Sequence, residues 1–439
     1  MRLFGQVIQA GHSMELEATG RKRARASSGV LAVDRLSALP DCLIHHIMSF
    51  MKARQVVQTC VLSTRWTHLW RSVPCLNIDQ EEFMTAGPDR HWKEGWEKFE
   101  DFTDHLLIPN NIAIALLDTF RLQVRDWHCE EKAARWIRHA IKYCAQAPDI
   151  QRDRLSSRSW RLKKLHLSNV RLDDRFAKHV STRCLSLEDL ELNNCDCSIH
   201  EITFHSLKNL HLKHCSWSDL SAITSPTLIS LVIDGGSNTY GCLLVIHAPA
   251  VAYMVLSVHG FKGGVLLTRM QSLSKASIHI WDDSMSDDLS KLANDQLKLL
   301  DSVRNVTSLE LSHFETLVFG EEFTTFPEFQ NLRTLLLDHC DLSDNFQTLA
   351  HFLTNAPNLE KLTLRYCKFT KDYNKRKAKA NMAMTFSSQH LNLVDFQCKN
   401  LKFTEIIYGN ESVRKLVKLL VSISENLPRN NVQLTKVGL

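Results

Sequence analysis

A short leucine pattern, Leu-x-x-Leu-x-Leu-x-x-Cys, recurs along the chain and constrains its fold more than any other feature. Four complete copies begin at Leu187, Leu207, Leu332 and Leu359. Weaker copies centre on Phe120, Leu165, Leu231, Met254, Ala276 and Leu309. From residue 165 onward, successive centres are separated by 20 residues (190 to 210) at the least and by 33 residues (276 to 309) at the most. A repeat of this length indicates similar units stacked side by side.

The two leucines of Leu-x-Leu lie on one face of a strand, because side chains alternate along a strand. When neighbouring copies place their strands side by side, a parallel sheet grows over a continuous apolar core. The period is that of leucine-rich repeats. We therefore predict an α/β solenoid with parallel strands on its concave face and helices and loops on its convex face. The repeat cysteines, including Cys195, Cys215, Cys340 and Cys367, should be buried structural thiols.

Several segments between the strands have helical spacing. Residues 129–146, 289–303 and 346–353 each place apolar side chains on one helix face. Residues 92–106 do the same and should form a helix that joins the N-terminal region to the first repeat. We place a helical linker at 80–109 and the solenoid at 110–397.

The segment 34–79 has the spacing of three short helices. Its first apolar set runs from Leu39 to Met51, with Pro40 near the helix start, and its second set includes Val56, Val57, Cys60 and Val61. Ser63 is the expected N-cap of a third helix that carries Trp66 and Trp70 one turn apart. Three short helices cannot cover so many large apolar side chains by themselves. That surface should be buried against another protein, or else against the rest of the chain.

The same segment resembles an F-box, through Leu-Pro-x-x-Leu-Ile-x-x-Ile-x-Ser-Phe at 39–50 and Leu-Ser-x-Arg-Trp-x-x-Leu-Trp at 62–70. It departs from the family at Met51-Lys52, where many members carry Leu-Pro. The resemblance implies binding to a Skp-type adaptor and, through it, to a cullin-RING ligase. The chain would then be a substrate receptor of an SCF-type ubiquitin ligase. The adaptor-binding residues implied are Leu39, Pro40, Leu43, Ile47, Val57, Leu62, Trp66, Leu69 and Trp70.

The C-terminal segment 398–439 is predicted to form one more strand, up to Tyr408, and a closing helix. Asn410 or Ser412 would cap that helix, whose apolar face continues to Leu427. This arrangement is similar to the FBD-type tail of plant F-box proteins. Together with the F-box and the repeats, it makes residues 34–437 resemble the plant F-box/FBD/LRR-repeat family.

Strand positions beside and between the leucines form the natural ligand surface of a solenoid. Their mixed charges suit a protein partner and disfavour nucleic acid, whose binding faces are strongly basic. The candidate partner-binding residues are His166, Glu191, His211, Glu310, Asp338, Lys361 and Arg365. The irregular segments 273–309 and 371–379 interrupt the period, and at least one is expected to contact the substrate. A degradative receptor and a non-degradative scaffold both fit, because both need the same two surfaces.

No catalytic, metal or cofactor motif stands out. Cys195, Cys197 and His200 form a local cluster that lacks Cys-x-x-Cys spacing, and His200 and His205 lie five residues apart where a metalloprotease helix needs four. The glycine pairs at 235–236 and 263–264 lack the lysine of a phosphate loop. We therefore expect a non-catalytic protein with no cofactor.

The chain has no apolar run of about 18 residues that could span a bilayer. The odd count of 13 cysteines, with no secretion signal in residues 1–33, indicates a reducing compartment, either the cytoplasm or the nucleus. The basic cluster at 21–25 is either a nuclear localisation signal or part of a solvated, disordered tail. A net charge of +5 is too small to identify a partner.

Overall fold

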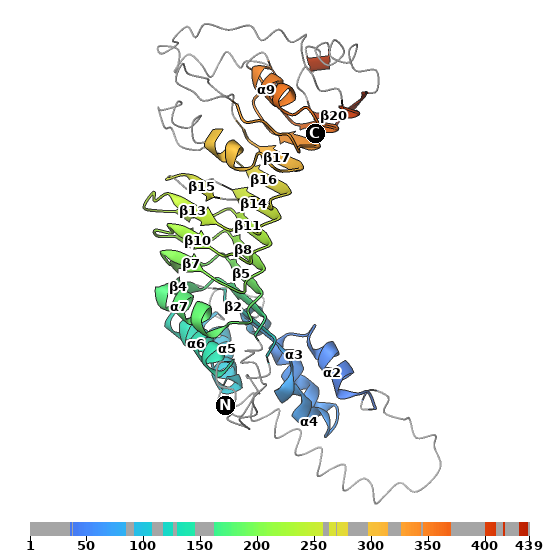
Figure 1. The fold of residues 1–439 in the computed structure, drawn as a ribbon. Helices are drawn as coiled ribbons and strands as arrows, with labels where there is room; N and C mark the ends of the chain where they lie inside the picture. The colour runs from blue at the N-terminus through green and yellow to red at the C-terminus, as the bar shows by residue number, and fades with distance from the viewer. Residues whose placement is uncertain are drawn as a thin grey trace, which may run out of the picture. The chain divides into compact units, whose positions relative to one another are not determined.

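The chain is mixed α/β, with a helical N-terminal region and a sheet-rich remainder (Figure 1). It divides into two compact units, Met1–Trp217 and Ser218–Leu439. The computed structural model describes residues 36, 38–84, 92–107, 117–125, 130–144, 162–257, 263–268, 270–279, 297–314, 326–343, 346–369, 400–409, 416–417 and 430–437. Within these ranges, none of the helices has the length and apolar character needed to cross a membrane.

The N-terminal region contains the three predicted helical segments. They are α2 (Asp41–Met48), α3 (Ala53–Gln58) with the 3-10 turn η1 (Thr59–Val61), and α4 (Trp66–Leu69) with the 3-10 turn η2 (Trp70–Ser72). Ile44 and Met48 lie one turn apart and are completely buried. The prediction that Ser63 caps the third helix is wrong by two residues, because Arg65 occupies the N-cap position. Ser63 instead supplies its carbonyl to the turn before the helix, accepting from the Trp66 amide at 3.1 Å.

The main sheet of the first unit is parallel. Its strands follow in the order β1 (Cys75–Asp79), β2 (Thr119–Gln123), β3 (Lys164–Ser168), β5 (Asp189–Asn193) and β8 (Asn209–Lys213). The sheet therefore begins at β1, within the segment that resembles an F-box and before residue 110, where the solenoid is predicted to start. Leu76 and Ile78 of β1 are buried like the repeat leucines, but β1 lacks the rest of the repeat pattern that would reveal it.

The second unit continues the same construction. Its parallel strands follow in the order β11 (Ser230–Asp234), β14 (Tyr253–Ser257), β16 (Lys275–His279), β17 (Ser308–Ser312), β18 (Thr334–Asp338), β19 (Lys361–Arg365), β20 (Phe403–Tyr408) and β21 (Asn431–Lys436). Equivalent apolar residues are in register, so that Leu309 lies beside Leu335, and Leu335 beside Leu362. All three are completely or almost completely buried.

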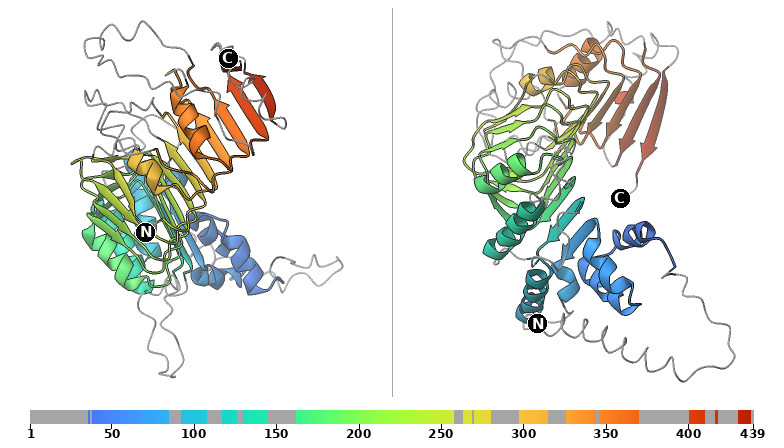
Figure 2. Two further views of the ribbon diagram at one scale, coloured as in Figure 1. Left: turned by 45° about the horizontal axis from the view of Figure 1, so that its top comes forward. Right: turned by 60° about the horizontal axis from the view of Figure 1, so that its bottom comes forward.

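The segments that return between these strands are partly helical. In the first unit they include α6 (Glu130–Cys144) and α7 (Asp174–Arg183), and in the second α9 (Gln347–Asn355), which lies across one face of the strands around it (Figure 2). The helices predicted at 129–146 and 346–353 are thus confirmed. Of the helix predicted at 289–303, residues 297–302 are helical and 289–296 lie outside the described ranges.

Other return segments are short strands where the sequence predicted helices or loops. They are β4 (Arg171–Asp173), β6 (Asp196–Ser198), β7 (Glu201–Thr203) and β9 (Ser216–Trp217) in the first unit, and β10 (Ala222–Thr224), β12 (Ser237–Asn238), β13 (Leu244–His247) and β15 (Val265–Thr268) in the second. Repeat length explains the difference. The 27 residues from Leu335 to Leu362 leave room for α9, whereas the 20 from Leu190 to Leu210 do not leave room for a helix and its two turns.

The repeat cysteines close the ends of the strands. Cys195, Cys215, Cys340 and Cys367 are all buried, as predicted. Each thiol donates to a leucine carbonyl of the preceding strand, from Cys195 to Leu167 at 3.5 Å and from Cys367 to Leu337 at 3.3 Å, for example. A cysteine at this position therefore donates a hydrogen bond to a buried backbone carbonyl oxygen. Its side chain is also small and apolar enough to be buried, which explains why the repeat ends in cysteine.

At the C-terminal end, β20 confirms the strand predicted up to Tyr408. The predicted closing helix lies mostly outside the described residues, apart from residues 416 and 417, which are helical, with Leu416 buried. Strand β21, which pairs in parallel with β20, was not predicted from the sequence. Val432 and Leu434 alternate as in other strands, but no consensus repeat surrounds them. The last described element is therefore a strand and not a helix.

The linker predicted at 80–109 contains η3 (Gln80–Phe83) and α5 (Trp92–Leu106), which is the amphipathic helix expected at 92–106. Its buried face includes Phe99, whose ring meets Phe83 edge-on at 5.6 Å and Trp136 of α6 at 5.5 Å. The Trp136 indole donates to Asp104 at 2.6 Å. The linker is therefore part of the core of the first unit.

Candidate interaction surfaces

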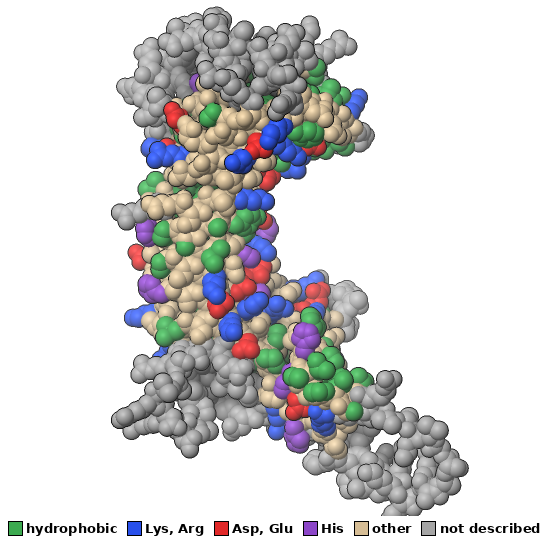
Figure 3. Space-filling view, turned by 45° about the vertical axis from the view of Figure 1, so that its right-hand side comes forward, with side chains coloured by type: hydrophobic (Ala, Val, Ile, Leu, Met, Phe, Trp, Pro, Cys, Tyr) green, Lys and Arg blue, Asp and Glu red, His purple; other side chains and the backbone are tan. Residues whose placement is uncertain are grey.

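The N-terminal helices expose a cluster of large apolar side chains, which we call the helical apolar surface. Its members are Leu36, Leu43, Ile47, Phe50, Val61 and Leu62. The most exposed is Phe50, at 78%. Helix α2 is amphipathic, so Leu43 and Ile47 point outward while Ile44 and Met48 point into the core. In Figure 3 the hydrophobic side chains of this region gather in one patch beside histidines. A contiguous patch of this kind marks an interaction site.

The residues predicted to bind an adaptor divide into two groups. Pro40, Leu43, Ile47 and Leu62 are exposed, and Leu39 is half-buried. Val57, Trp66, Leu69 and Trp70 are buried, with both indoles only 3% exposed. These four side chains pack between the helices, as some members of the set are expected to do, and their assignment to adaptor binding stays a prediction. The spacing of two tryptophans one turn apart shows that they share one helix face. It does not show whether that face packs against the chain itself or against another protein. Leu36, Phe50 and Val61 were missed.

Polar contacts fix these helices onto strand β1. The His45 imidazole lies 3.2 Å from the Leu69 carbonyl, joining α2 to α4. Lys52 forms an ion pair with the buried Asp79 carboxylate at 2.6 Å, and its hydrogen bond to Asp79 raises the pKa of Lys52. The Arg54 guanidinium lies 5.0 Å from the Phe83 ring centroid. The helical apolar surface is thereby held in a defined place on the first unit.

Three of the predicted partner-binding residues lie side by side on the strand face of the first unit. His166, Glu191 and His211 are in register on β3, β5 and β8. The His166 Nδ1 atom is 3.4 Å from a Glu191 carboxylate oxygen, whose partner oxygen is 2.9 Å from Lys213 Nζ. Burial lowers the pKa of His166 in spite of the nearby carboxylates. Burial alone would raise the pKa of Glu191, but the hydrogen bond and charge of Lys213 lower it.

The other four predicted residues lie in the second unit and form two ion-pair groups. Arg365 contacts Asp338 at 2.9 Å and Glu310 at 3.5 Å. Its hydrogen bond to Asp338 raises the pKa of Arg365. Lys361 pairs with Glu405 at 3.5 Å and lies 5.2 Å from the Phe403 ring centroid. The structure thus brings Glu310, Asp338 and Arg365 together and places Lys361 in the neighbouring pair. Both groups occupy the strand face.

The second unit also carries a row of aromatic rings that was not predicted from the sequence, which we call the ring row. It consists of His313, His339 and Tyr366, each immediately after a strand of the second unit and each in the left-handed backbone conformation. The imidazoles of His313 and His339 stack with centroids 5.1 Å apart, and His339 lies 5.2 Å from Tyr366. Burial lowers the pKa of His313. The sequence feature that could have revealed this row is the position of its members in the repeat. Each ring occupies the last variable position before the buried residue that ends the repeat.

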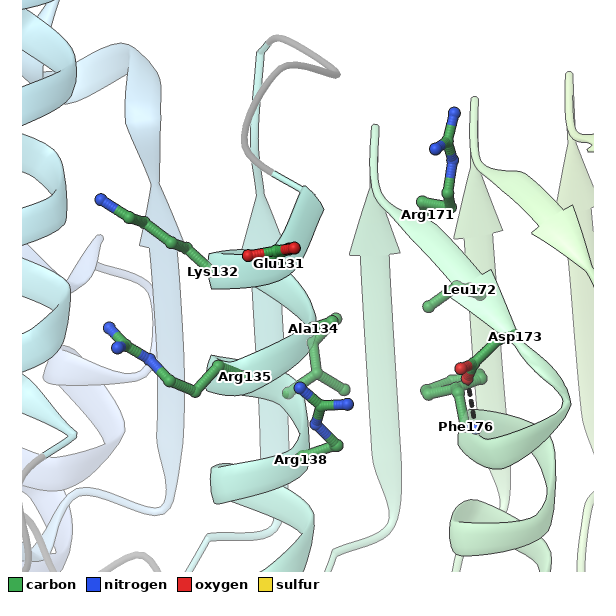
Figure 4. Close-up of a pocket in the computed structure, with 10 residues that line it drawn as sticks. Glu131, Lys132, Ala134, Arg135, Arg138, Arg171, Leu172, Asp173 and Phe176 are labelled. Atoms are coloured by element: carbon green, nitrogen blue, oxygen red, sulfur yellow. Dashed lines mark hydrogen bonds between the residues drawn. The ribbon is translucent and has the colours of Figure 1, made fainter.

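A cavity of about 620 Å³ opens between α6, β4 and α7 in the first unit (Figure 4). Ile137, Leu172 and Phe176 contribute apolar lining, and four cations lie around it. Three of these cations already have acidic partners, because Lys132 pairs with Glu100, Arg135 with Asp104 and Arg171 with Asp196. We assign no ligand to this cavity.

The cysteine and histidine cluster near residue 195 does not converge on one point. Cys195 and Cys197 are buried, whereas His200 is exposed and its Nδ1 atom lies 2.7 Å from an Asp174 carboxylate oxygen. Among the residues that the structure describes, no group of three or more histidine, cysteine or acidic side chains could hold a metal ion. Most of segment 273–309 is described, but its residues 280–296 and the whole of 371–379 are not.

Comparison with known proteins relates both the helical region and the whole chain to proteins of plants. A family model described as the F-box domain matches residues 36–77. The MEIOTIC F-BOX protein MOF of Oryza sativa subsp. japonica is 31% identical over 415 residues, which cover 90% of this chain and 84% of the relative. An F-box/FBD/LRR-repeat protein of Arabidopsis thaliana is 25% identical over 393 residues, or 80% of both chains. An FBD-associated F-box protein of the same plant is 26% identical over 400 residues, or 82% of this chain and 80% of the relative.

The helical region is therefore an F-box, and the whole chain is an F-box protein. Because the similarity extends through the helices and the strands alike, the chain belongs to the plant F-box/FBD/LRR-repeat family.

Proposed function

We propose that the protein is a substrate receptor of an SCF-type ubiquitin ligase. In this proposal the helical apolar surface binds a Skp-type adaptor, which connects the chain to a cullin-RING ligase. The observation that carries the proposal is the exposure of Leu43, Ile47, Phe50 and Leu62 in the segment that the F-box model matches. Such a patch costs free energy in water unless another protein covers it.

We propose further that the strands form a leucine-rich-repeat solenoid that recruits the protein to be ubiquitinated. Parallel strands in register, with buried leucines at equivalent positions, support this architecture, as do the names of several relatives. Residues 398–439 would be its FBD-type end. The strand face offers charged residues at regular spacing, which suits binding. The chain would contribute contacts and leave ubiquitin transfer to other subunits, in the cytoplasm, the nucleus or both.

The adaptor interaction can be tested by co-purification from cells treated with a proteasome inhibitor. Leu43→Asp combined with Ile47→Asp places two charges in the proposed interface and should abolish recovery of the adaptor and the cullin. Leu185→Asp is a matched control, because Leu185 is a similarly exposed leucine of the first unit outside the F-box. It should leave recovery unchanged. Undiminished recovery with the double variant would overturn the proposed docking.

A degradative role has its own measurement. Proteins that co-purify with the wild type should carry ubiquitin chains and should lose them in the double variant, although their binding to the strands persists. Co-purifying proteins without ubiquitin in either sample would favour a non-degradative scaffold.

A further inference from the structure

The first three main-sheet strands of the second unit, β11, β14 and β16, differ from the strands that follow them. All three are described in full, and none of their side chains forms an ion pair with another described residue. The strands that follow carry the ion pairs of Arg365 and of Lys361. Val232 and Val255 instead lie in register at the middle of β11 and β14, and both are half-buried. A small apolar surface therefore interrupts the charged strand face.

Tyr253, at the start of β14, is the aromatic member of this surface and is 37% exposed. Its amide donates to the carbonyl of Ile229 at 3.2 Å, and Ile229 is 49% exposed. Lys275 lies in register with Tyr253 on β16, and its Nζ atom is 5.6 Å from the centroid of the tyrosine ring. This lysine is exposed, and no carboxylate of the described residues lies within ion-pair distance of it. We call the following residues the tyrosine site: Ile229, Val232, Tyr253, Val255 and Lys275.

The second unit contains the same combination of lysine and ring once more, with the ring on the following strand. Lys361 is in register with Phe403, and its Nζ atom lies 5.2 Å from the centroid of that ring. There the lysine also pairs at 3.5 Å with Glu405, two residues after the ring on the same strand. The residue two positions after Tyr253 is Val255, which cannot form an ion pair. The tyrosine site therefore lacks the carboxylate that its counterpart has within the chain.

We propose that the tyrosine site binds a segment of the recruited protein in which an acidic side chain lies near an apolar one. The carboxylate pairs with Lys275, in the role that Glu405 has at the counterpart site. The apolar side chain packs against Tyr253 and Val255. Charge complementarity selects the partner, and tyrosine is typical of the residues that dominate protein interfaces. This proposal rests on the proposed function, since it names the chemistry of the recruited protein.

The size of the tyrosine site favours a short segment over a second copy of the chain. A stable interface between two folded proteins buries about 1,000 Å² or more, which exceeds what a few partly exposed side chains can supply. A surface this small also remains soluble when it is empty, because isolated exposed apolar side chains are common on proteins. The tyrosine site can therefore exchange its partners.

The test uses the full chain, co-expressed with a Skp-type adaptor, and three fluorescent peptides of glycine and serine with amidated C-termini. The first has a central tryptophan and an aspartate two residues before and after it, because alternate side chains of an extended peptide face the same way. The second replaces the tryptophan with serine, and the third replaces both aspartates with asparagine. Fluorescence anisotropy should show about tenfold weaker binding of the second peptide and about fivefold weaker binding of the third than of the first.

Variants of the chain assign these differences to the tyrosine site. Lys275→Gln should bind the first peptide only as tightly as the wild type binds the third. The matched control is Lys361→Gln, which should bind the first peptide like the wild type, because Glu405 already occupies that lysine. Val255→Glu supplies a carboxylate from within the chain and should prevent the first peptide from binding. Tyr253→Thr, which keeps a residue suited to a strand, should lose most of the preference for tryptophan.

Equal affinity of the wild type for all three peptides would overturn the proposal, and so would equal weakening by the two lysine variants. Unchanged melting temperatures would show that the variants fold. If Tyr253→Thr is unstable, Lys275→Gln decides the question, because it alters only an exposed side chain. Dimerisation of the wild type in light scattering, abolished by Lys275→Gln, would also overturn the proposal, since a second copy would then cover the site.

Co-elution of the adaptor is measured in the same samples. A chain that prefers the first peptide but fails to co-elute with the adaptor would support the tyrosine site and overturn the proposed receptor function. Co-elution without that preference would support the receptor function and overturn the tyrosine site.

Discussion

The F-box and the parallel strands expose their side chains in opposite ways. On the F-box, the large apolar side chains of Phe50, Leu43 and Ile47 face the solvent. On the strands the leucines are buried almost completely, and the exposed positions carry ion pairs such as Glu191 with Lys213 and Asp338 with Arg365. An apolar surface needs a permanent cover, whereas a polar face remains soluble when it is empty. The difference suggests one constant partner for the F-box and an exchangeable partner for the strands.

The largest expected effect is on the free energy of unfolding, and it should differ between a buried leucine of the strands and an exposed leucine of the F-box. Leu190→Ala removes a side chain buried in β5 and should lower the free energy of unfolding by about 2–5 kcal/mol, because it leaves a cavity in the core. Leu43→Ala alters an exposed position and should change it by less than about 0.5 kcal/mol. Urea denaturation of the two variants measures both values. Equal losses of unfolding free energy in the two variants would mean that Leu43 packs within the chain like Leu190. The contrast between an exposed F-box surface and buried strand leucines would then be wrong.

A smaller effect separates binding from stability on the F-box itself. Phe50→Ala should weaken adaptor binding by about 2 kcal/mol if Phe50 is an anchor of the interface, with little change in unfolding. Trp70→Ala should behave differently, because Trp70 is buried and its loss destabilises the helices before any partner binds. Calorimetric titration with the adaptor and thermal melting distinguish the two. A Phe50 variant with wild-type affinity would remove it from the interface.

Ion pairs on the strand face should contribute unequally. Arg365→Met leaves the Asp338 carboxylate, which is the less exposed partner, without its cation. We expect a loss of about 1 kcal/mol in unfolding free energy, after allowing for solvent screening of the partly exposed guanidinium. Lys208→Met breaks a fully surface pair with Glu188 and should cost less than about 0.5 kcal/mol. Chemical denaturation measures the unfolding free energy of both variants. An equal loss in the two would mean that partial burial does not make the Arg365 pair more stabilising than the Lys208 pair.

The smallest effect depends on pH. The pKa of His166 is lowered from 6.5 by burial, so the unfolded chain binds a proton at higher pH than the folded chain. Its contribution to stability is therefore present above pH 6.5 and declines as the pH falls through the lowered pKa. His166→Gln should flatten the decline in melting temperature below pH 6.5 and match the wild-type slope at pH 8. Identical profiles for wild type and variant would contradict this account of His166.

Periodicity predicted most of the architecture, because alternation of leucines dictates both the strand and the face that it buries. It did not reveal β1 or β21, whose apolar pairs lack the flanking consensus, nor the short return strands, which follow from repeat length. On the F-box, sequence spacing identified the helix faces but could not tell which face was covered. The spacing of Trp66 and Trp70 therefore did not show that both are buried within the chain. The ring row depends on side chains more than twenty residues apart, so no local pattern shows that they stack.

We propose that the F-box alone binds the adaptor and leaves the strand face open for another protein. Hydrogen–deuterium exchange of the full chain, with and without a Skp-type adaptor, tests it most directly. Adding the adaptor should slow amide exchange in α2, α3 and η1 and leave exchange in the strands from β17 to β20 unchanged. Protection of those strands with no change in the F-box helices would contradict it.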